Sequence, residues 1–477
     1  MYDTNYIVKV AKALEPTIFN DEQLEIINEL LKYQDYYDND VFKHIVRVNP
    51  EYEQRIYTSK SYIPTQVPLN YSRLIVDKLS SWQFQEGIDF NCTSESNQNR
   101  ADEIEKDLYL IHKQNKMDEK LLQAATEANI SGGVAFKLKY DEANKYVRIL
   151  PRNRIECFPV YEFDDYENIY RVHFIAFQDE KTIWKQTYDF EAGVCYIEEA
   201  LYDTQNISEP KSVIIPRQKL GFNGKWVDFL PVYIIPNIPQ LGEVWGLSEL
   251  SDLIPIIDEI NRKYSDLSDS LRFDMFAITV MLNMQVDSDN PPKTKAGAIW
   301  DLAGGTPDGA RADVFKLESQ FSYIESLKYH IDSLVSYLFE FSQVVNLSVD
   351  RVSGLGSLSG VALKLLFSSI ISKTNKKNII WAVKLRDIYL GALKMKQIYE
   401  GYDIPDDLDI EVIMHNPIPQ TEQEEVNVLV QKITAGLISI TNAMNEIGIE
   451  NPEEEIAKII EEKKMFDREL SIETRNE

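Results

Sequence analysis

Paired carboxylates come closest, in this 477-residue chain, to a pattern that could support metal chemistry. Asp164 with Asp165, and Asp406 with Asp407, could hold a divalent cation that activates water against a phosphodiester. Because the chain has 77 Asp and Glu residues, neighbouring acids are also expected by chance. The histidines stand alone, and they are His44, His112, His173, His330 and His415. Without an HExxH motif, a CxxC pair, an EF-hand loop or a Walker A sequence, the chain indicates no catalytic residue, metal site or cofactor.

A glycine-rich loop is the second candidate, because backbone amides in such loops can cradle phosphate groups. It reads Gly-Leu-Gly-Ser-Leu-Ser-Gly from Gly354 to Gly360. Ser359 stands where the GxGxxG pattern requires glycine, and the loop follows a predicted helix rather than a strand. The sequence therefore favours a mobile connector between two helices over a nucleotide site.

Two long amphipathic helices must position this loop, and each carries apolar residues at alternating steps of three and four. This spacing makes a narrow seam of the coiled-coil type. With Ser248 as its N-cap, the first helix is predicted to run to about Leu282, which gives a length of roughly 50 Å. Pro255 either kinks this helix or marks its true first turn. The two seams consist of Leu250, Leu253, Ile257, Ile260, Tyr264, Leu267 and Leu271, and of Ile324, Leu327, Ile331, Leu334, Leu338, Phe341 and Val345.

The rest of the chain alternates helical and β-like patterns, which predicts an α+β protein. Helices are expected over 70–84, 101–114 and 117–131, and short strands over 134–235. A Pro- and Gly-rich insert, about 283–320, separates the two long helices and contains β-like runs. A third long helix is predicted over about 361–399, followed by the strand 410–414 and by further helices.

The charge balance is strongly acidic, with 50 Lys and Arg against 77 Asp and Glu and a formal net charge of −27. Such a chain should repel nucleic acid, which argues against a gene regulator or sequence-specific nuclease but allows a conduit for DNA. The third helix is basic, while the first is acidic, so a basic face could meet an acidic neighbour or phosphate in an assembly. Ordinary solvated faces are the alternative. The lysines considered are Lys364, Lys373, Lys376, Lys377 and Lys384. Of these, Lys373, Lys376 and Lys377 are expected to be exposed, so changing them should cost little stability.

Targeting and redox signals are few. No apolar run approaches the roughly 20 residues that a membrane helix needs, and the N-terminus lacks the features of a signal peptide. Cys92, Cys157 and Cys195 are far apart and odd in number, so reduced thiols in a cytosolic setting are expected.

The order of five sequence segments resembles the portal proteins of tailed double-stranded DNA bacteriophages. The first two are Leu-Pro-Val-Tyr-Ile-Ile-Pro-Asn at 230–237 and Gly-Leu-Ser-Glu-Leu-Ser-Asp-Leu-Ile-Pro-Ile-Ile-Asp-Glu-Ile-Asn at 246–261. Ser-Gly-Val-Ala-Leu-Lys at 359–364 follows the connector loop. Asn-Pro-Ile-Pro at 416–419 precedes an acidic helix, and Gly-Leu-Ile-Ser at 436–439 opens the next one. The resemblance covers residues 60–465, although no single segment is diagnostic alone.

The resemblance implies a portal fold of the α+β class, with parts in a fixed order. These are a mixed α/β wing at 1–246, stem helices at 247–282 and 321–345, and a small α/β clip at 283–320 between them. A tunnel loop at 346–360, a long wing helix and strand at 361–415 and a helical crown at 416–477 complete the chain.

The resemblance also implies a head-to-tail connector rather than an enzyme. A ring, usually of twelve copies, would sit at one capsid vertex of the virion after assembly in the host bacterial cytoplasm. Double-stranded DNA would pass through it without sequence specificity during packaging and ejection. Expected partners are further copies of the chain, the large terminase, the major capsid and scaffolding proteins and neck or adaptor proteins, with no membrane and no cofactor.

Two groups of residues follow from this implied layout. The tunnel loop would line the DNA channel with Val349, Asp350, Arg351, Ser353, Gly354, Leu355, Gly356 and Ser357. The clip would present a docking surface containing Asn290, Lys293, Lys295, Trp300 and Asp301.

A different class of function stays open at this point, namely a phage-encoded, metal-dependent phosphodiesterase that uses clustered carboxylates. It would need a pocket in which acids or histidines converge.

Overall fold

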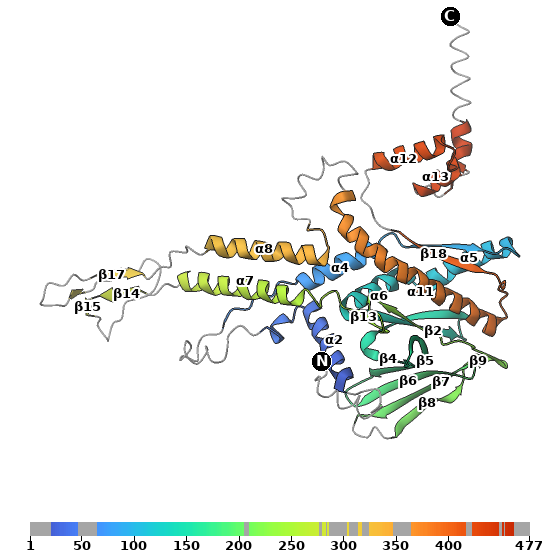
Figure 1. The fold of residues 1–477 in the computed structure, drawn as a ribbon, viewed down its shortest axis with the longest axis horizontal. Coiled ribbons are helices and arrows are strands. Elements are labelled where there is room, and N and C mark those ends of the chain that lie inside the picture. The colour runs from blue at the N-terminus through green and yellow to red at the C-terminus, as the bar shows by residue number, and fades with distance from the viewer. Residues whose placement is uncertain are drawn as a thin grey trace, which may run out of the picture. The chain divides into compact units, whose positions relative to one another are not determined.

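The structure is a computed structural model, and it comprises two compact units, which are described separately. The first unit contains Met1–Asn346 and Ile370–Asn416, and the second contains Leu347–Ser369 and Pro417–Glu477. Figure 1 gives the element labels, and the thin grey trace marks residues that are not described. The described residues are 21–45, 64–204, 209–275, 279–282, 284–285, 303–304, 313–316, 324–346, 364–415, 422–447, 451–452 and 454–461.

The core of the first unit is a three-stranded antiparallel sheet with helices packed against it. Its strand order is β11 (Val232–Pro236), β2 (Gly133–Asp141) and β3 (Tyr146–Asn153). The long helix α11 (Ser368–Glu400) contributes Trp381, whose ring meets Phe136 of β2 and Phe84 edge to face. Three further helices complete this core, namely α4 (Tyr71–Phe84), α5 (Gln98–Gln114) and α6 (Met117–Ser131).

A second, five-stranded antiparallel sheet follows in strict chain order. Its strands are β4 (Cys157–Glu162), β5 (Asp165–Phe177), β6 (Thr182–Glu191), β7 (Val194–Asp203) and β8 (Pro210–Lys219). The short 3-10 helix η2 (Arg154–Glu156) connects it to β3. Together with the three-stranded sheet, it confirms both the α+β class and the strands predicted between residues 134 and 235.

Smaller strand pairs link distant parts of the first unit. β1 (Ile88–Thr93) pairs antiparallel with β18 (Asp409–Met414), which includes the strand predicted at 410–414. β9 (Gly221–Phe222) pairs with β10 (Lys225–Trp226), and β12 (Ile238–Pro239) pairs with β13 (Gly246–Leu247). The helix α2 (Asp21–Tyr37), followed by η1 (Val41–Lys43), contacts α4 and α6.

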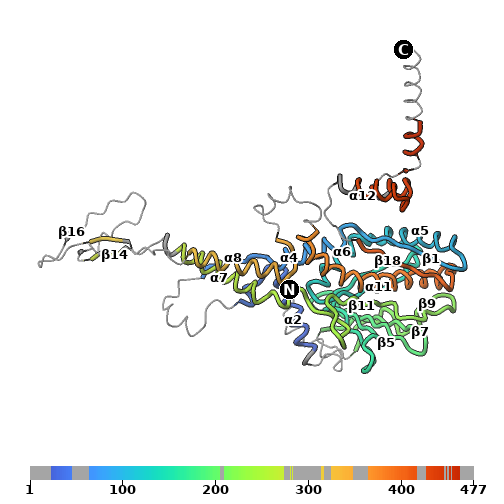
Figure 2. Tube along the Cα trace, turned by 45° about the horizontal axis from the view of Figure 1, so that its top comes forward, coloured from blue at the N-terminus to red at the C-terminus, as the bar shows by residue number. Residues whose placement is uncertain are grey.

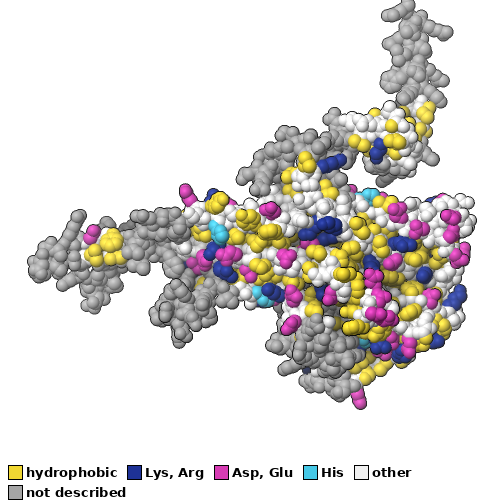
Figure 3. All heavy atoms as spheres, viewed as in Figure 1, with side chains coloured by type: hydrophobic (Ala, Val, Ile, Leu, Met, Phe, Trp, Pro, Cys, Tyr) yellow, Lys and Arg dark blue, Asp and Glu magenta, His cyan; other side chains and the backbone are white. Residues whose placement is uncertain are grey.

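The two seam-bearing helices are α7 (Ile254–Met275) and α8 (Ile324–Ser342), and they lie side by side in Figures 1 and 2. Ile257 and Ile260 of α7, with Ile331 and Leu338 of α8, are buried as their spacing predicts. The seam prediction was wrong for Leu271 and Phe341, which are exposed. In Figure 3, hydrophobic side chains lie among charged ones along these rods. We call α7 and α8 the rods.

The predicted limits of the first rod were wrong at both ends. The helix begins at Ile254 rather than just after Ser248, so Pro255 stands in its first turn, where a missing N–H costs nothing. At the other end, residues 279–282 form β14 (Thr279–Leu282), which pairs with β17 (Asp313–Lys316). β15 (Met284–Gln285) pairs with β16 (Ala303–Gly304), so the insert between the rods is β-structured where it is described.

An extended segment, residues 64–69, is fastened along α7 by side chains from successive helical turns. We call it the strap. The amide of Thr65 donates to Asp269 Oδ1 at 3.0 Å and that of Val67 to Ser265 Oγ at 3.0 Å. Similarly, Leu69 N–H donates to Asn261 Oδ1 at 2.7 Å. Because the three acceptors are spaced by four, they form one stripe on the helix and match every second amide of the strap.

Glycine 391 explains how closely α11 approaches the three-stranded sheet. A Cβ at this position would lie 2.1 Å from Tyr233 Oη and 2.9 Å from Leu138 Cδ1. We expect Gly391→Ala to lower the free energy of unfolding by about 1–3 kcal/mol, because a well-packed core resists added volume. Chemical denaturation measures this loss. The control Ser372→Ala lies on an exposed part of α11 and should change stability by less than about 0.5 kcal/mol.

Removing the Tyr233 hydroxyl tests the cause of that loss. Tyr233→Phe, combined with Gly391→Ala, should recover part of the lost stability, since the shortest contact disappears. If Gly391→Ala lowers the free energy of unfolding equally with and without Tyr233→Phe, the hydroxyl is not the group that obstructs the added methyl.

The second unit includes the short helices α12 (Glu422–Thr434) and α13 (Ile440–Glu446), which contact one another. Residues 454–461 are helical as well. Gly436, with a φ of +70°, lies in the turn between α12 and α13, where glycine adopts a left-handed conformation without strain.

Candidate functional site

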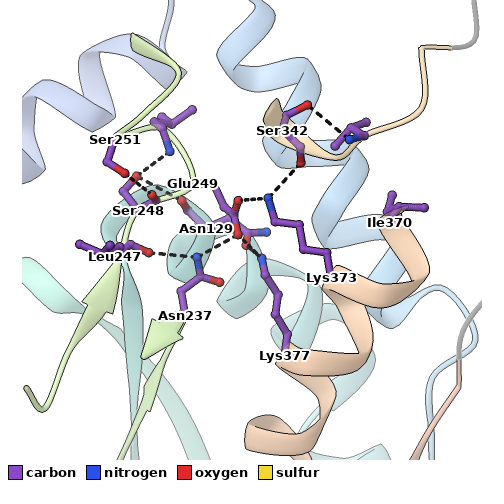
Figure 4. A network of polar contacts seen from close by, with 12 residues as sticks. Asn129, Asn237, Leu247, Ser248, Glu249, Ser251, Ser342, Ile370, Lys373 and Lys377 are labelled. Atoms are coloured by element: carbon purple, nitrogen blue, oxygen red, sulfur yellow. Dashed lines mark hydrogen bonds and ion pairs between the residues drawn. The ribbon is translucent and has the colours of Figure 1, made fainter. Parts of the chain in front are cut away.

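A buried polar junction lies where the rods join the α/β body, and Glu249 is its centre (Figure 4). Glu249 follows β13 in a short turn ahead of α7, and its amide donates to Asn129 O at 2.9 Å. Within this turn the Leu250 amide donates to Ser248 Oγ at 3.0 Å, and Ser251 Oγ donates to Ser248 O at 2.9 Å. Ser248 therefore caps this turn, not the long helix that was predicted to start there.

Two lysines of α11 share the Glu249 carboxylate. Lys377 Nζ lies 2.6 Å from Glu249 Oε1, and Lys373 Nζ forms an ion pair with Oε2. Because the lysines are four residues apart on one helix, both ammonium groups reach the same side. Asn237 Nδ2 donates to Glu249 Oε1 at 3.2 Å, so the carboxylate also accepts a neutral hydrogen bond.

The lysines extend the junction to two further segments. Lys377 Nζ donates to Asn129 Oδ1 of α6 at 2.5 Å, and Lys373 Nζ donates to Ser342 O at the end of α8 at 2.9 Å. Nearby, Lys78 Nζ donates to Val345 O at 3.3 Å. Cations at the carboxyl end of α8 also match the negative end of its helix dipole.

Charge is unevenly compensated inside the junction. Burial alone would raise the pKa of Glu249, but the ammonium groups of Lys377 and Lys373 outweigh it and lower this pKa to about 2. For Lys377, burial lowers the pKa, and the single carboxylate offsets this only in part. One carboxylate is thus paired with two ammonium groups. Their contacts join α6, the β12–β13 hairpin, α8 and α11. A carboxylate held in this way belongs to a structural ion pair and is not suited to act as a general base.

A pocket of about 390 Å³ adjoins the junction. Its lining includes Phe341 from α8, Lys376 and Ile380 from α11, and Ile238 from β12. In Figure 3, Lys and Arg side chains gather on the surface where the rods meet the α/β body.

A comparison with protein families decides the broad identity. Residues 17–469 match the family described as phage portal protein, SPP1 Gp6-like. The chain belongs to this family of phage portal proteins. A search of curated proteins finds no match.

Family membership confirms the resemblance seen in the sequence and, with it, the α+β portal fold. The match spans nearly the whole chain, so it includes the rods, the insert between them and the basic helix. As a portal protein, the chain is of the head-to-tail connector class. Within the described residues, no helix is long and apolar enough to cross a membrane.

The lysines predicted on the basic helix of this portal protein divide into two kinds. Lys364 and Lys376 are exposed and Lys384 is half-buried, but Lys377 is buried and only 14% of the Lys373 side chain is exposed. The expectation that Lys373, Lys376 and Lys377 are exposed was therefore wrong for Lys373 and Lys377, because both form ion pairs with the buried Glu249. Changing these two lysines cannot be treated as a surface substitution.

The partners of these lysines, Glu249 and Asn129 among them, were not predicted from the sequence, although the position of Glu249 in the chain offered an indication. Asn237 and Glu249 both lie in the segments, 230–237 and 246–261, that carried the family resemblance. From its place directly after the predicted N-cap Ser248, Glu249 has the pattern of an acid near a helix N-terminus, which does not indicate a buried partner. A polar residue shared by a family motif and followed by apolar neighbours is a reasonable candidate for a buried partner.

Most of the remaining predicted sites fall outside the described residues, and two of the paired acids, Asp165 and Asp407, accept hydrogen bonds from nearby groups. All tunnel-loop residues from Val349 to Ser357, and all clip residues from Asn290 to Asp301, lie outside the described part of the chain. Asp407 accepts hydrogen bonds from Ser94 and Ser96, which fixes a turn before α5. No group of three or more His, Cys, Asp or Glu side chains suited to a metal occurs within the described ranges.

Two histidines that stood alone in the sequence have partners in the core. His112 Nδ1 lies 2.7 Å from Tyr389 Oη, and His173 Nδ1 lies 2.9 Å from Thr187 Oγ1. All three cysteines are free and buried. Burial raises the pKa of Cys92 to about 12, so this thiol stays protonated and unreactive at neutral pH.

Proposed function

We propose that this chain is the subunit of a closed portal ring, of twelve copies, at one vertex of the capsid. The observation that carries the proposal is a pair of packed rods, anchored to an α/β body through a buried three-charge junction, in a chain that matches the portal family over residues 17–469. In such a ring the rods would form a tube through which DNA is packaged and ejected.

The domain layout proposed for the ring follows the chain order. The wing would comprise 1–246 and 361–415, the stem the rods within 247–282 and 321–345, and the crown 416–477. We propose the segment 283–320 as the clip; β15, β16 and β17 lie within it, and β17 pairs with β14, which precedes it. The tunnel loop is placed at 346–360, between the second rod and α11.

The proposed partners follow from this layout. The large terminase would dock on the clip during packaging and supply the ATPase, so this chain would not act as an enzyme. After packaging, neck or adaptor proteins would bind to the same clip end of the ring. The major capsid and scaffolding proteins would surround the ring, which is assembled in the host cytoplasm and retained in the virion.

Stiffening the tunnel loop should impair DNA handling without preventing ring formation. The loop holds one acid, Asp350, and one base, Arg351, among Ser, Gly, Leu and Val, so it is too weakly charged to grip phosphates. Its proposed role therefore depends on shape change, which Gly354→Pro with Gly356→Pro would restrict. We expect rings of normal appearance that package or retain less DNA, as measured by nuclease-protected DNA per particle.

The matched control replaces the two neighbouring serines, Ser353→Ala with Ser357→Ala, which alters side chains but adds no proline. Normal amounts of full-length DNA in particles carrying the proline variant would exclude loop flexibility as the mechanism.

A further inference from the structure

The buried junction contains more positive charge than its own carboxylate neutralises. Lys373 and Lys377 are both paired with Glu249, and the exposed fractions of the three side chains are only 14%, 6% and 2%. A charge that is removed from water and left uncompensated is costly. The junction therefore favours the approach of one further negative group.

Each lysine of the junction also has a hydrogen-bond donor to spare. An ammonium group has three N–H donors, and within the described residues two of them find acceptors on each lysine (Figure 4). Lys377 donates to Glu249 Oε1 and Asn129 Oδ1, and Lys373 donates to Glu249 Oε2 and Ser342 O. Because the lysines are one helical turn apart, both ammonium groups lie on the same side of α11. A carboxylate, which has two oxygen atoms, can accept from both.

The pocket of about 390 Å³ beside the junction gives such a group access, since Lys373 and Lys377 are part of its lining. One water molecule needs about 10–15 Å³ of such space, so the pocket has room for a group of side-chain size. Its other charged residues, Lys376 and Asp252, are exposed and opposite in sign, so the surplus of one positive charge persists. The apolar part of the lining consists of Ile238, Pro239, Leu253, Phe341 and Ile380.

This lining distinguishes between anions by charge and by polarity. A singly charged group neutralises the one surplus positive charge, whereas a phosphate dianion would leave a negative charge close to Asp252. The apolar residues gain free energy by covering an apolar stem, which chloride and inorganic phosphate lack. A carboxylate on a short apolar stem satisfies both conditions.

We propose that the pocket binds a carboxylate on a short apolar stem, with its oxygen atoms on Lys373 and Lys377 and its stem against Phe341 and Ile380. This binding site goes beyond the proposed portal function, because a single chain contains all of its lining residues. The carboxylate comes either from a free small molecule or from an Asp or Glu side chain of a neighbouring copy, and the experiment separates these two sources.

Urea titration of the unaltered chain in the presence of butyrate tests the pocket. Butyrate supplies the carboxylate and the stem, while butyramide has nearly the same shape without the charge. Exchanging chloride for butyrate at constant ionic strength leaves general screening unchanged. We expect saturating butyrate to raise the ratio of folded to unfolded chains at least about tenfold, because it binds only the folded state. Butyramide and chloride should change this ratio less than about twofold.

Two variants test the residues that hold the ligand. Lys373→Met removes the surplus charge and one donor, so the butyrate effect should disappear. It should persist in the control Lys384→Met, because Lys384 lies on α11 but outside the pocket lining. Phe341 is exposed, so Phe341→Ala leaves the core intact. This variant should weaken butyrate binding about 3- to 10-fold and leave acetate binding unchanged, because acetate lacks the longer stem.

The source of the carboxylate follows from comparing single chains with rings, separated by size before the titration. If butyrate binds to single chains but not to rings, a carboxylate of the neighbouring copy fills the pocket. Equal binding to both indicates a free carboxylate.

Three results would overturn the inference. They are equal effects of butyrate and butyramide, a larger effect of phosphate than of butyrate, and an undiminished butyrate effect in Lys373→Met. If Lys373→Met does not fold, equal butyrate affinities of Phe341→Ala and the unaltered chain would overturn it as well. Rings without any butyrate effect on rings or single chains would contradict the pocket alone and leave the portal proposal intact.

Discussion

Replacing Glu249 with glutamine is expected to lower the free energy of unfolding by about 3–5 kcal/mol, since it leaves two largely buried ammonium groups without their anion. Glutamine keeps the size of the side chain and can still accept from Asn237, so the loss reports charge rather than shape. Denaturant titration measures it. The control Lys376→Gln lies beside the junction lysines on α11 but is exposed, and should change stability by less than about 0.5 kcal/mol.

The pH dependence of this loss has a definite sign. The pKa of Glu249 is lowered from 4.5 to about 2 in the folded chain. Its stabilising contribution is therefore complete above about pH 4.5 and disappears as the pH falls towards 2. The stability difference between the unaltered chain and Glu249→Gln should shrink over that window. A difference that stays constant between pH 5 and pH 3 would show that ion pairing is not its source.

Removing the polar stripe of α7 is expected to release the strap. The triple variant Asn261→Leu, Ser265→Ala and Asp269→Leu takes away the acceptors of three strap amides. Each amide left without its acceptor costs up to about 1–3 kcal/mol if water does not reach it, and these half-buried amides can regain water when the strap detaches. Detachment would raise hydrogen exchange at Thr65, Val67 and Leu69 by more than about tenfold.

The control for the strap uses another polar residue of the same helix. Ser270 Oγ donates only to Asp266 O within α7, at 2.9 Å, so Ser270→Ala should leave strap exchange unchanged. If the triple variant exchanges at the rate of the unaltered chain, the stripe does not hold the strap. If it unfolds completely, the single variant Asn261→Leu gives the same readout at Leu69.

Periodicity was sufficient to predict the rods and the fold class. A helix or strand that buries one face has apolar residues at a regular spacing, and this spacing can be found in the sequence alone. It is three and four in α7 and α8, and two in the short strands after Gly133. Family membership then confirmed the resemblance that the ordered segments had indicated. The two ends of α7 could not be predicted from the sequence. They are set by the turn at Ser248 and by the pairing of β14 with β17, which depend on distant residues.

The junction and the strap could not be predicted from such patterns. Lys377 has the sequence surroundings of a solvated lysine, and only its contact with Glu249 and Asn129 shows that it is buried. Likewise, Asn261, Ser265 and Asp269 resemble an ordinary polar face until the strap amides are placed against them. Both cases depend on partners that are remote in sequence, which single-sequence patterns do not encode.

Electron microscopy of the purified chain decides whether it forms a ring. We expect closed rings of twelve copies with a central hole, formed by the chain alone at sufficient protein concentration. Class averages should show the rods as a narrow tube below a wider body. A monodisperse monomer at all protein and salt concentrations, or a compact particle with no central hole, would contradict the assignment of this chain as a portal ring subunit.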